Sequence, residues 1–169
     1  MSSVIRRYSE KDLTIASFNE LDLTTRTEIS KLIKTPKSYV AETLGGRGAV
    51  RFGEISGLGE IVVKQYARGG VLRRIIKSSH LRLGKVVRSQ WEFLMLHRVR
   101  QLGVRAPLPI AFAYTRGFFY QAWLIMEKIQ SANSLAALSL TDQDLVRSVA
   151  CEVIRQIEIL VRNQVFHLD

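Results

Sequence analysis

Short apolar runs separated by glycine and serine occupy the region from residue 38 to residue 66. Breaks of this kind between β-branched and aromatic residues indicate successive antiparallel strands. We predict three strands here, at Tyr39–Leu44, Ala49–Ile55 and Glu60–Tyr66. Further along, the prolines of VRAPLPIA exclude a helix, and we predict a hairpin with strands Ile110–Tyr114 and Phe118–Ile129.

A first helix is predicted at Thr25–Lys34, where Thr25 and Glu28 fit a capping box and three apolar residues form one face. Pro36 follows and is expected to end it. Residues 1–23 mix charged residues with short apolar pieces and predict no firm element. We interpret the helix at Thr25–Lys34 as an N-terminal brace that packs on the main domain, in preference to a catalytic role.

Two longer helices are predicted further along the chain. Gln90–Leu102 has an apolar stripe with helical spacing, and Gly103 is a suitable residue for its C-terminal end. The stripe consists of Trp91, Met95, Val99 and Leu102. Asp142–Arg162 has a broad apolar face that would be buried against further protein. Strands and helices together indicate an α+β fold with an antiparallel sheet.

Composition and charge narrow the class of protein. A chain of 169 residues that is 47% hydrophobic is sufficient for one core. Its formal charge of +10 favours polyanionic partners, which include nucleic acid, an anionic membrane surface and nucleotides. Cys151 is the single cysteine, and the three histidines lack metal-ligand spacing. We expect a chain without a resident metal site, soluble or peripheral to a membrane, because no signal peptide or membrane span is evident.

The candidate phosphate-binding residues lie between Gly45 and Lys64. Gly45, Gly46 and Gly48 lie between two predicted strands, where backbone N–H groups can approach a phosphate closely. The alternative is an ordinary hairpin, since glycine-rich spacings are common in turns. Lys64 lies in the apolar run that follows. A half-buried strand would hold this cation at a cost unless a carboxylate lies beside it.

Glu92 is the candidate partner of Lys64. It is the first acidic residue after Glu60, and it lies near the start of the helix predicted at Gln90–Leu102. Facing inward, its carboxylate would fix the lysine for contact with a phosphate. Its position near the helix start also fits a surface glutamate that stabilises a helix N-terminus.

Residues 67–89 form a strongly basic segment without any acidic residue. Apolar residues at helical spacing within Gly70–Ser78 allow an amphipathic helix with a basic face. A solvated charged face and a surface that meets anionic lipid or a phosphorylated substrate are both consistent with this pattern. Specific nucleic-acid binding is disfavoured, because no aromatic residue is interleaved among the charges for base stacking.

The order of these features resembles the protein-kinase superfamily: glycine-rich loop, strand lysine, helix glutamate, a strand ending in Met-Glu, a long helix and His-x-Asp. GGRGAVRF, VVKQYARGGVLRR, SQWEFLMLHRVRQLGVRAPLPIA and GFFYQAWLIMEKIQSANSLAAL resemble the lipopolysaccharide kinase family. Within it, the closest likeness is to members that phosphorylate 3-deoxy-D-manno-octulosonic acid (Kdo). The resemblance covers residues 38–169.

This resemblance implies a protein-kinase-like small lobe, followed by the first helices of a large lobe. It divides the chain into an N-terminal extension (1–37), an ATP-binding lobe (38–129), and a hinge with the start of the second lobe (130–169). The expected cofactors are ATP and Mg²⁺.

The resemblance also assigns roles to residues. The three glycines would cover the ATP phosphates, and Lys64 paired with Glu92 would contact them. Met126 would close the adenine pocket, and Glu127 and Ile129 would bind adenine through backbone groups. Asp169, in the His-x-Asp motif, would be the catalytic base, with His167 holding its loop.

The implied acceptor is a Kdo-lipid A type molecule at the cytoplasmic face of the inner membrane. The family's metal ligands would lie beyond Asp169, the last residue, so we expect no phosphate transfer by these 169 residues alone. Two alternatives stay open. One is a non-catalytic, kinase-like nucleotide-binding module, and the other is a kinase of the same superfamily acting on another small molecule or a protein. Self-association through Asp142–Arg162 is also open.

Residues 68–88 are predicted to contact an anionic membrane surface. Replacing Arg73, Arg74 and Lys77 with glutamate should weaken binding to anionic vesicles at low salt, because each replacement reverses one charge. Co-sedimentation with vesicles checks this. Unchanged binding would contradict the prediction.

Overall fold

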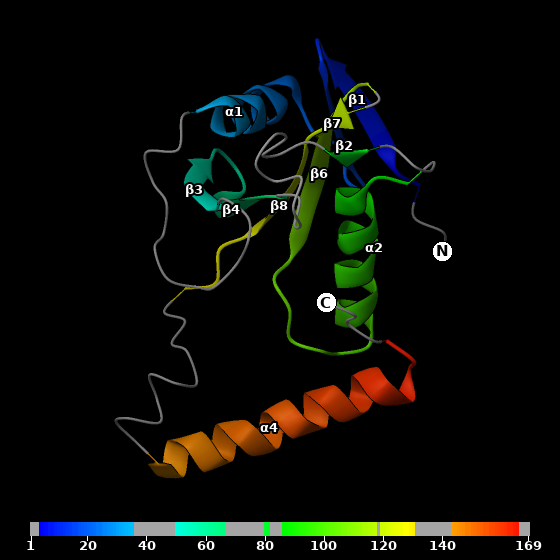
Figure 1. Cartoon of the computed structure of the whole chain (residues 1–169). Coiled ribbons are helices and arrows are strands. Elements are labelled where there is room, and N and C mark those ends of the chain that lie inside the picture. Colours follow the sequence, from blue (N-terminus) through cyan, green and yellow to red (C-terminus); the bar gives the residue numbers. More distant parts are fainter. Residues whose placement is uncertain are drawn as a thin grey trace, which may run out of the picture.

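The computed structural model describes residues 4–35, 50–66, 80–81, 86–117, 119–130 and 143–165. A six-stranded antiparallel sheet in the order β1-β2-β6-β8-β4-β3 forms its centre (Figure 1). Its strands are β1 (Arg6–Glu10), β2 (Leu13–Ser17), β3 (Val50–Ile55), β4 (Gly59–Gln65), β6 (Pro109–Thr115) and β8 (Ala122–Glu127). A short pair, β5 (His80–Leu81) and β7 (Phe119–Tyr120), forms a second, two-stranded sheet. The predicted α+β class is confirmed.

Most of the predicted strands are present with shifted ends. β3 and β4 correspond to the strands predicted at Ala49–Ile55 and Glu60–Tyr66. The strand predicted at Phe118–Ile129 is wrong as one element, because β7 and β8 replace it and the sheet ends at Glu127. The strand predicted at Tyr39–Leu44 lies outside the described residues.

The N-terminal hairpin of β1 and β2 was not predicted. Every residue of β2 is buried, and the strand pairs with β6 on its other side. Leu13 and Ile15 contribute to one core cluster and Ala16 to the cluster on the opposite face. Because both faces of β2 are covered, it lacks the apolar-polar alternation that identifies a half-buried strand. The N-terminal part therefore extends the sheet, as well as packing on it.

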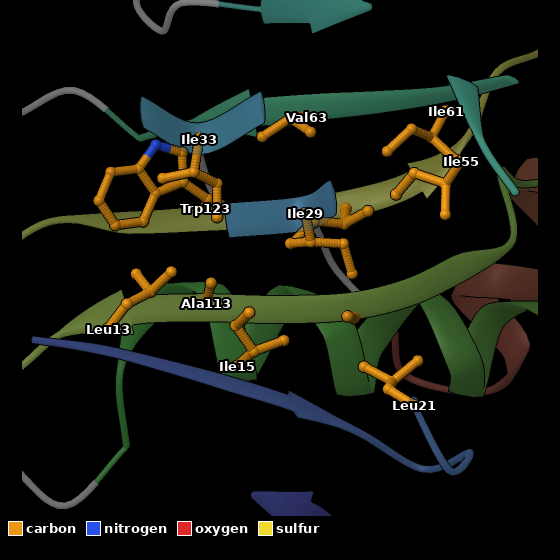
Figure 2. Packing of buried hydrophobic residues seen from close by; sticks show 12 residues of the cluster. Leu13, Ile15, Leu21, Ile29, Ile33, Ile55, Ile61, Val63, Ala113 and Trp123 are labelled. Atoms are coloured by element: carbon orange, nitrogen blue, oxygen red, sulfur yellow. The ribbon is translucent and has the colours of Figure 1, made fainter. Parts of the chain in front are cut away.

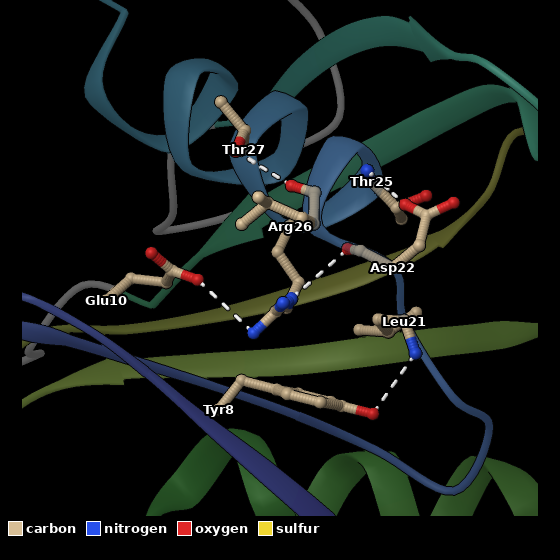
Figure 3. A network of polar contacts seen from close by, with 8 residues as sticks. Tyr8, Glu10, Leu21, Asp22, Thr25, Arg26 and Thr27 are labelled. Atoms are coloured by element: carbon tan, nitrogen blue, oxygen red, sulfur yellow. Dashed lines mark hydrogen bonds and ion pairs between the residues drawn. The ribbon is translucent and has the colours of Figure 1, made fainter.

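Helix α1 (Leu23–Lys34) begins earlier than predicted. Asp22 is its N-cap, since the Asp22 carboxylate Oδ1 accepts a hydrogen bond of 2.7 Å from the Thr25 backbone N–H (Figure 3). This hydrogen bond lowers the pKa of Asp22. The predicted capping box is therefore wrong: Thr25 is buried inside the first turn, and Glu28 instead accepts a 3.1 Å hydrogen bond from the Ser56 N–H.

The two faces of the sheet are covered by different helices. On one face, Ile29 and Ile33 of α1 pack with β-strand residues such as Ile61, Val63 and Trp123 (Figure 2). On the other face, Phe93 of helix α2 (Arg88–Gln101) packs in a second cluster. The second cluster also includes Ala16, Tyr66, Val87, Phe112, Tyr120, Ala122 and Leu124. Alternate residues of each strand therefore face different helices.

The predicted apolar stripe of α2 is wrong at Trp91 and omits Phe93, whereas Val99 is buried as predicted. Trp91 is 52% exposed, whereas Phe93 is fully buried and Val99 is buried with it. Phe93 lies against Phe18 and Phe112, with ring centroids 5.1 and 5.2 Å apart respectively. The uninterrupted apolar run Phe93–Leu96 makes more than one buried face possible in this sequence, and the packing of Phe93 between aromatic side chains selects one of them.

Helix α4 (Gln143–Arg162) lies below α2 in Figure 1 and agrees closely with the prediction. Polar contacts attach it: the Arg105 N–H donates to Gln156 Oε1 at 2.8 Å, and Arg98 donates to the Asn163 carbonyl at 3.2 Å. Several large apolar side chains of α4 remain exposed, namely Leu145, Val153, Ile154, Ile157 and Val161. None of the described helices is both long and apolar enough to cross a membrane.

The corrected phase of α2 predicts the effect of two substitutions. Phe93→Ala should reduce the free energy of unfolding by about 3–5 kcal/mol, because it leaves a cavity in the core. Trp91→Ala should cost less than about 1 kcal/mol, since this side chain is half exposed. Urea unfolding followed by circular dichroism measures both. Equal losses would contradict the observed phase.

Candidate active site

Lys64 lies on β4 on the face of the sheet that carries α2. Its strand neighbours Val63 and Ile61 point to the face covered by α1, so the alternation of side chains places Lys64 opposite them. Its register partners are Val50 on β3 and Leu124 on β8. The site therefore lies on one defined face of the sheet, beside α2.

Lys64 and Glu92 form the ion pair predicted from the sequence. The Lys64 Nζ donates to Glu92 Oε1 at 2.8 Å, and the side chains are 38% and 23% exposed. Glu92 lies one turn inside α2, and the N-cap of that helix is Val87. The alternative of a glutamate at the helix N-terminus is thus wrong. The ammonium stays accessible to a further anion while its partner is largely enclosed.

Tyr66 completes this site and was missed in the sequence. Its hydroxyl donates a short hydrogen bond to Glu92 Oε2, so both carboxylate oxygens are engaged. Burial, and secondly the negative charge of Glu92, raise the pKa of Tyr66. The Lys64 Nζ lies 5.2 Å from the Tyr66 ring centroid. Position i+2 on the strand of Lys64 is the signal that could have identified Tyr66, because it shares that face.

The start of α2 is anchored to the sheet, and this anchoring positions Glu92. Ser89 is fully buried, and its hydroxyl donates to the Ala113 carbonyl on β6 at 3.2 Å. The Arg88 N–H donates to the Tyr120 hydroxyl at 3.3 Å, and the Arg88 guanidinium lies 5.4 Å from the Tyr66 ring centroid. Contacts on both sides of the helix start therefore set where the carboxylate lies.

The segment after β8 is fastened to the start of β4. Glu60 Oε1 accepts a 2.7 Å bond from the Lys128 Nζ, and its Oε2 accepts a short one from Gln130. These hydrogen bonds lower the pKa of Glu60. In addition, the Lys128 N–H donates to the Glu60 carbonyl at 3.0 Å. No local sequence pattern indicates the Glu60–Lys128 contact, because it joins residues 68 positions apart.

Three residues predicted to contact adenine lie along this segment. Met126 is partly buried and packs on the cluster of α2, opposite Val62 on β4. The Glu127 N–H donates to the Leu108 carbonyl at 2.9 Å. Ile129 is exposed, and its N–H has no acceptor among the described residues. A donor without an acceptor in the described part of the chain fits the adenine contact at Ile129, which stays a prediction.

A protein-family model for the lipopolysaccharide kinase (Kdo/WaaP) family matches residues 31–169. The chain belongs to this family. The sheet with α2 against one face is accordingly a kinase-like small lobe, as predicted.

Curated relatives of this family member are named 3-deoxy-D-manno-octulosonic acid kinase. One from Vibrio vulnificus is 35% identical over 104 residues, 60% of this chain and 44% of the relative. One from Vibrio cholerae is 29% identical over 126 residues, 73% and 53% respectively. One from Xanthomonas campestris is 35% identical over 94 residues, 54% and 37%. The chain thus spans about half of these relatives or less, and no solved structure matches it significantly.

Other predicted site residues of this family member lie outside the described residues. These are the phosphate-loop glycines Gly45, Gly46 and Gly48, the proposed base Asp169 with His167, and most of the basic segment 68–88. Their roles stay predictions. Within the described ranges, no group of three or more His, Cys, Asp or Glu side chains could hold a metal ion.

Tyr66→Phe tests the role of the hydroxyl in holding Glu92. We expect a loss of roughly 1.5–3 kcal/mol in the free energy of unfolding near pH 7, because a hydrogen bond to a charged group is removed. The raised pKa also gives a pH signature. Above about pH 10 the unfolded state releases the Tyr66 proton while the native state keeps it, so wild-type stability falls as pH rises.

Urea unfolding between pH 7 and pH 11 measures both effects. The Tyr66→Phe curve should fall less steeply above pH 10. Tyr8→Phe is the matched control. It removes the hydroxyl of a different tyrosine, which accepts a hydrogen bond from the Leu21 backbone N–H, and it leaves Tyr66 intact. Parallel alkaline slopes for wild type and Tyr66→Phe would contradict the assignment.

Proposed function

We propose that this chain forms the ATP-binding lobe of a kinase that phosphorylates the Kdo sugar of the lipopolysaccharide inner core. The observation that carries the proposal is the Lys64–Glu92 ion pair of 2.8 Å between β4 and α2, in a chain of the lipopolysaccharide kinase family. In kinases a pair of this kind holds the lysine that contacts the nucleotide phosphates. The name of the chain's curated relatives, 3-deoxy-D-manno-octulosonic acid kinase, supports the choice of acceptor.

The available groups of Lys64 fit a phosphate. An ammonium has three N–H donors, and Glu92 accepts from one of them. The remaining donors point from a half-exposed side chain, where they can reach phosphate oxygens. Tyr66 and Glu92 hold the ammonium in place, so little side-chain freedom is lost when a phosphate binds.

The adenine would lie against the segment after β8. Met126 offers an apolar surface on the α2 side, and the Ile129 N–H is a donor without an acceptor among the described residues. The Glu60 contacts hold this segment close to β4. Pre-organisation of this kind lowers the entropy cost of binding a planar base.

The remaining parts of the reaction rest on residues outside the described ranges. The phosphate-loop glycines would cover the ATP phosphates, and Asp169 would accept the proton of the attacking Kdo hydroxyl. ATP supplies the phosphoryl group that is transferred. Mg²⁺ is the expected counter-ion of the ATP phosphates. No metal-binding group of His, Cys, Asp or Glu side chains is present among the described residues of this chain.

We further propose that the protein works at the cytoplasmic face of the inner membrane. The net charge of +10 and the basic segment 68–88 support attraction to anionic lipid, which is where a Kdo-lipid A type acceptor would lie. The exposed apolar side chains of α4 support self-association of the chain through that helix.

Lys64→Met tests the ATP site. Titration with a fluorescent ATP analogue should show binding weakened about tenfold to a hundredfold, as expected when a charged hydrogen bond worth roughly 1.5–3 kcal/mol is lost. Glu92→Gln should weaken binding less, because the lysine remains but is no longer fixed. Arg6→Met is the control, since it removes a cation of an exposed ion pair at the far edge of the sheet.

Unchanged affinity in Lys64→Met would contradict the proposed site. The acceptor is tested separately, using the chain together with any coding sequence in frame after Asp169. Label transfer from ATP should require Kdo on the lipid acceptor. Equal labelling of the same lipid without Kdo would contradict the acceptor while leaving the ATP site unaffected.

A further inference from the structure

A hollow of about 450 Å³ lies between the β1–β2 turn and the outer side of α1. Its lining consists of Glu10, Lys11, Thr27, Ser30, Lys31, Lys34 and Thr35. The α1 residues of this set recur at helical spacing, on the side of the helix away from Ile29 and Ile33. Because α1 and Lys64 lie on opposite faces of the sheet, this hollow is separate from the candidate active site.

The charge in the hollow is positive. Three lysines face a single glutamate, and the Glu10 carboxylate is already paired with the Arg26 guanidinium at 3.5 Å (Figure 3). No described carboxylate lies within ion-pair distance of Lys11, Lys31 or Lys34. Three lysines that line one hollow without a described carboxylate partner favour a multiply charged anion.

The hydrogen-bond acceptors around the hollow are largely engaged. The hydroxyls of Thr27 and Thr35 donate to the carbonyls of Leu23 and Lys31, both at 2.8 Å. The Thr35 carbonyl accepts from the Arg51 Nε at 3.2 Å. At the end of α1, the Lys31 and Thr35 carbonyls, which would repel an anion, therefore each already accept a hydrogen bond. The groups left for a ligand are the three ammonium groups and the Ser30 hydroxyl.

Lys11 has an unusual backbone. Its φ of +54° lies in the left-handed region, which favours glycine or asparagine over a residue with a long side chain. The register of Glu10 with Leu13 makes Lys11 and Asp12 the two turn residues, so the turn carries the Lys11 side chain to the rim of the hollow. A strained backbone position that carries a charged side chain able to bind an anion is a reason to infer a functional role.

We propose that this hollow binds a phosphate monoester. Such a group is close to a dianion near neutral pH, and its three terminal oxygens can each accept a hydrogen bond from one of the three lysines that line the hollow. Two sources share this chemistry: the headgroup of a membrane lipid and a soluble phosphorylated molecule. The proposal does not rest on the proposed kinase function, because it involves the opposite face of the sheet.

The test uses the triple variant Lys11→Gly, Lys31→Gln and Lys34→Gln in the 169-residue chain. Glycine suits the backbone at position 11, and glutamine matches lysine in helix propensity, so the fold should be retained. Inorganic phosphate and glycerol 3-phosphate are titrated into labelled protein, followed by NMR of the α1 amides. Wild type should show saturable shifts at Ser30 and Lys31, and the variant should bind at least tenfold more weakly.

A second triple variant controls for net charge. It removes an equal number of positive charges from α4 through Arg147→Gln, Arg155→Gln and Arg162→Gln. Each of these arginines lies beside an acidic residue. This control should bind phosphate as wild type does. Equal weakening in both variants, or shifts in wild type that never saturate, would overturn the proposal. Lys11→Gly alone should weaken binding without lowering the melting temperature.

Vesicles distinguish the two sources. Phosphatidylcholine vesicles containing phosphatidate, a monoester, are compared with vesicles of equal charge containing phosphatidylglycerol, a diester. Stronger binding to phosphatidate, lost in the Lys11, Lys31 and Lys34 variant, supports a lipid headgroup. Equal binding to both vesicles together with saturable binding of glycerol 3-phosphate supports a soluble ligand. Lys64→Met should change neither result, which separates this test from that of the active site.

Discussion

The cost of placing a cation on a half-buried strand governs the active-site half of this molecule. Lys64 lies on β4, a strand with β3 on one side and β8 on the other, and its side chain is on the face of the sheet covered by α2. The cation needs a carboxylate that can reach it. Glu92 meets that need only if α2 crosses the sheet in one position. The buried contacts of Ser89 and Phe93 fix that position, so the packing of α2 and the chemistry of the site depend on the same few side chains.

The two faces of the sheet carry different chemistry for a reason visible in the strands. Ile61 and Val63 are apolar and buried under α1, whereas Val62 and Lys64 alternate with them toward α2. Helix α1 packs its apolar side chains on one face of the sheet. The polar side of the helix is therefore turned outward, toward the β1–β2 turn. One face of the sheet thus holds the lysine of the kinase-like lobe, and the opposite side of the molecule presents a separate basic hollow.

The sequence was sufficient for those features that depend on local pattern or on a single strong constraint. Gly-bounded apolar runs located β3 and β4, and the need of Lys64 for a partner identified Glu92. What failed depends on tertiary context. The strand β2 is buried on both faces and shows no alternation, and the phase of α2 was decided by aromatic packing around Phe93. The contacts of Glu60 join residues far apart in the sequence, which no local pattern encodes. The face that Tyr66 shares with Lys64 follows from strand alternation, but its contact with Glu92 depends on the position of α2.

One strand, β4, sets the distance between the two parts of the proposed nucleotide site. Glu60, near the start of β4, holds the segment proposed for adenine, and Lys64, near its end, holds the proposed phosphate contact. Four residues of extended chain separate the two anchors by about 13 Å. β4 pairs regularly with a strand on each side, so neither anchor can slide along the sheet without the other. A single inserted residue in β4 would therefore change the spacing and, because side chains alternate, turn Lys64 or Glu60 to the wrong face.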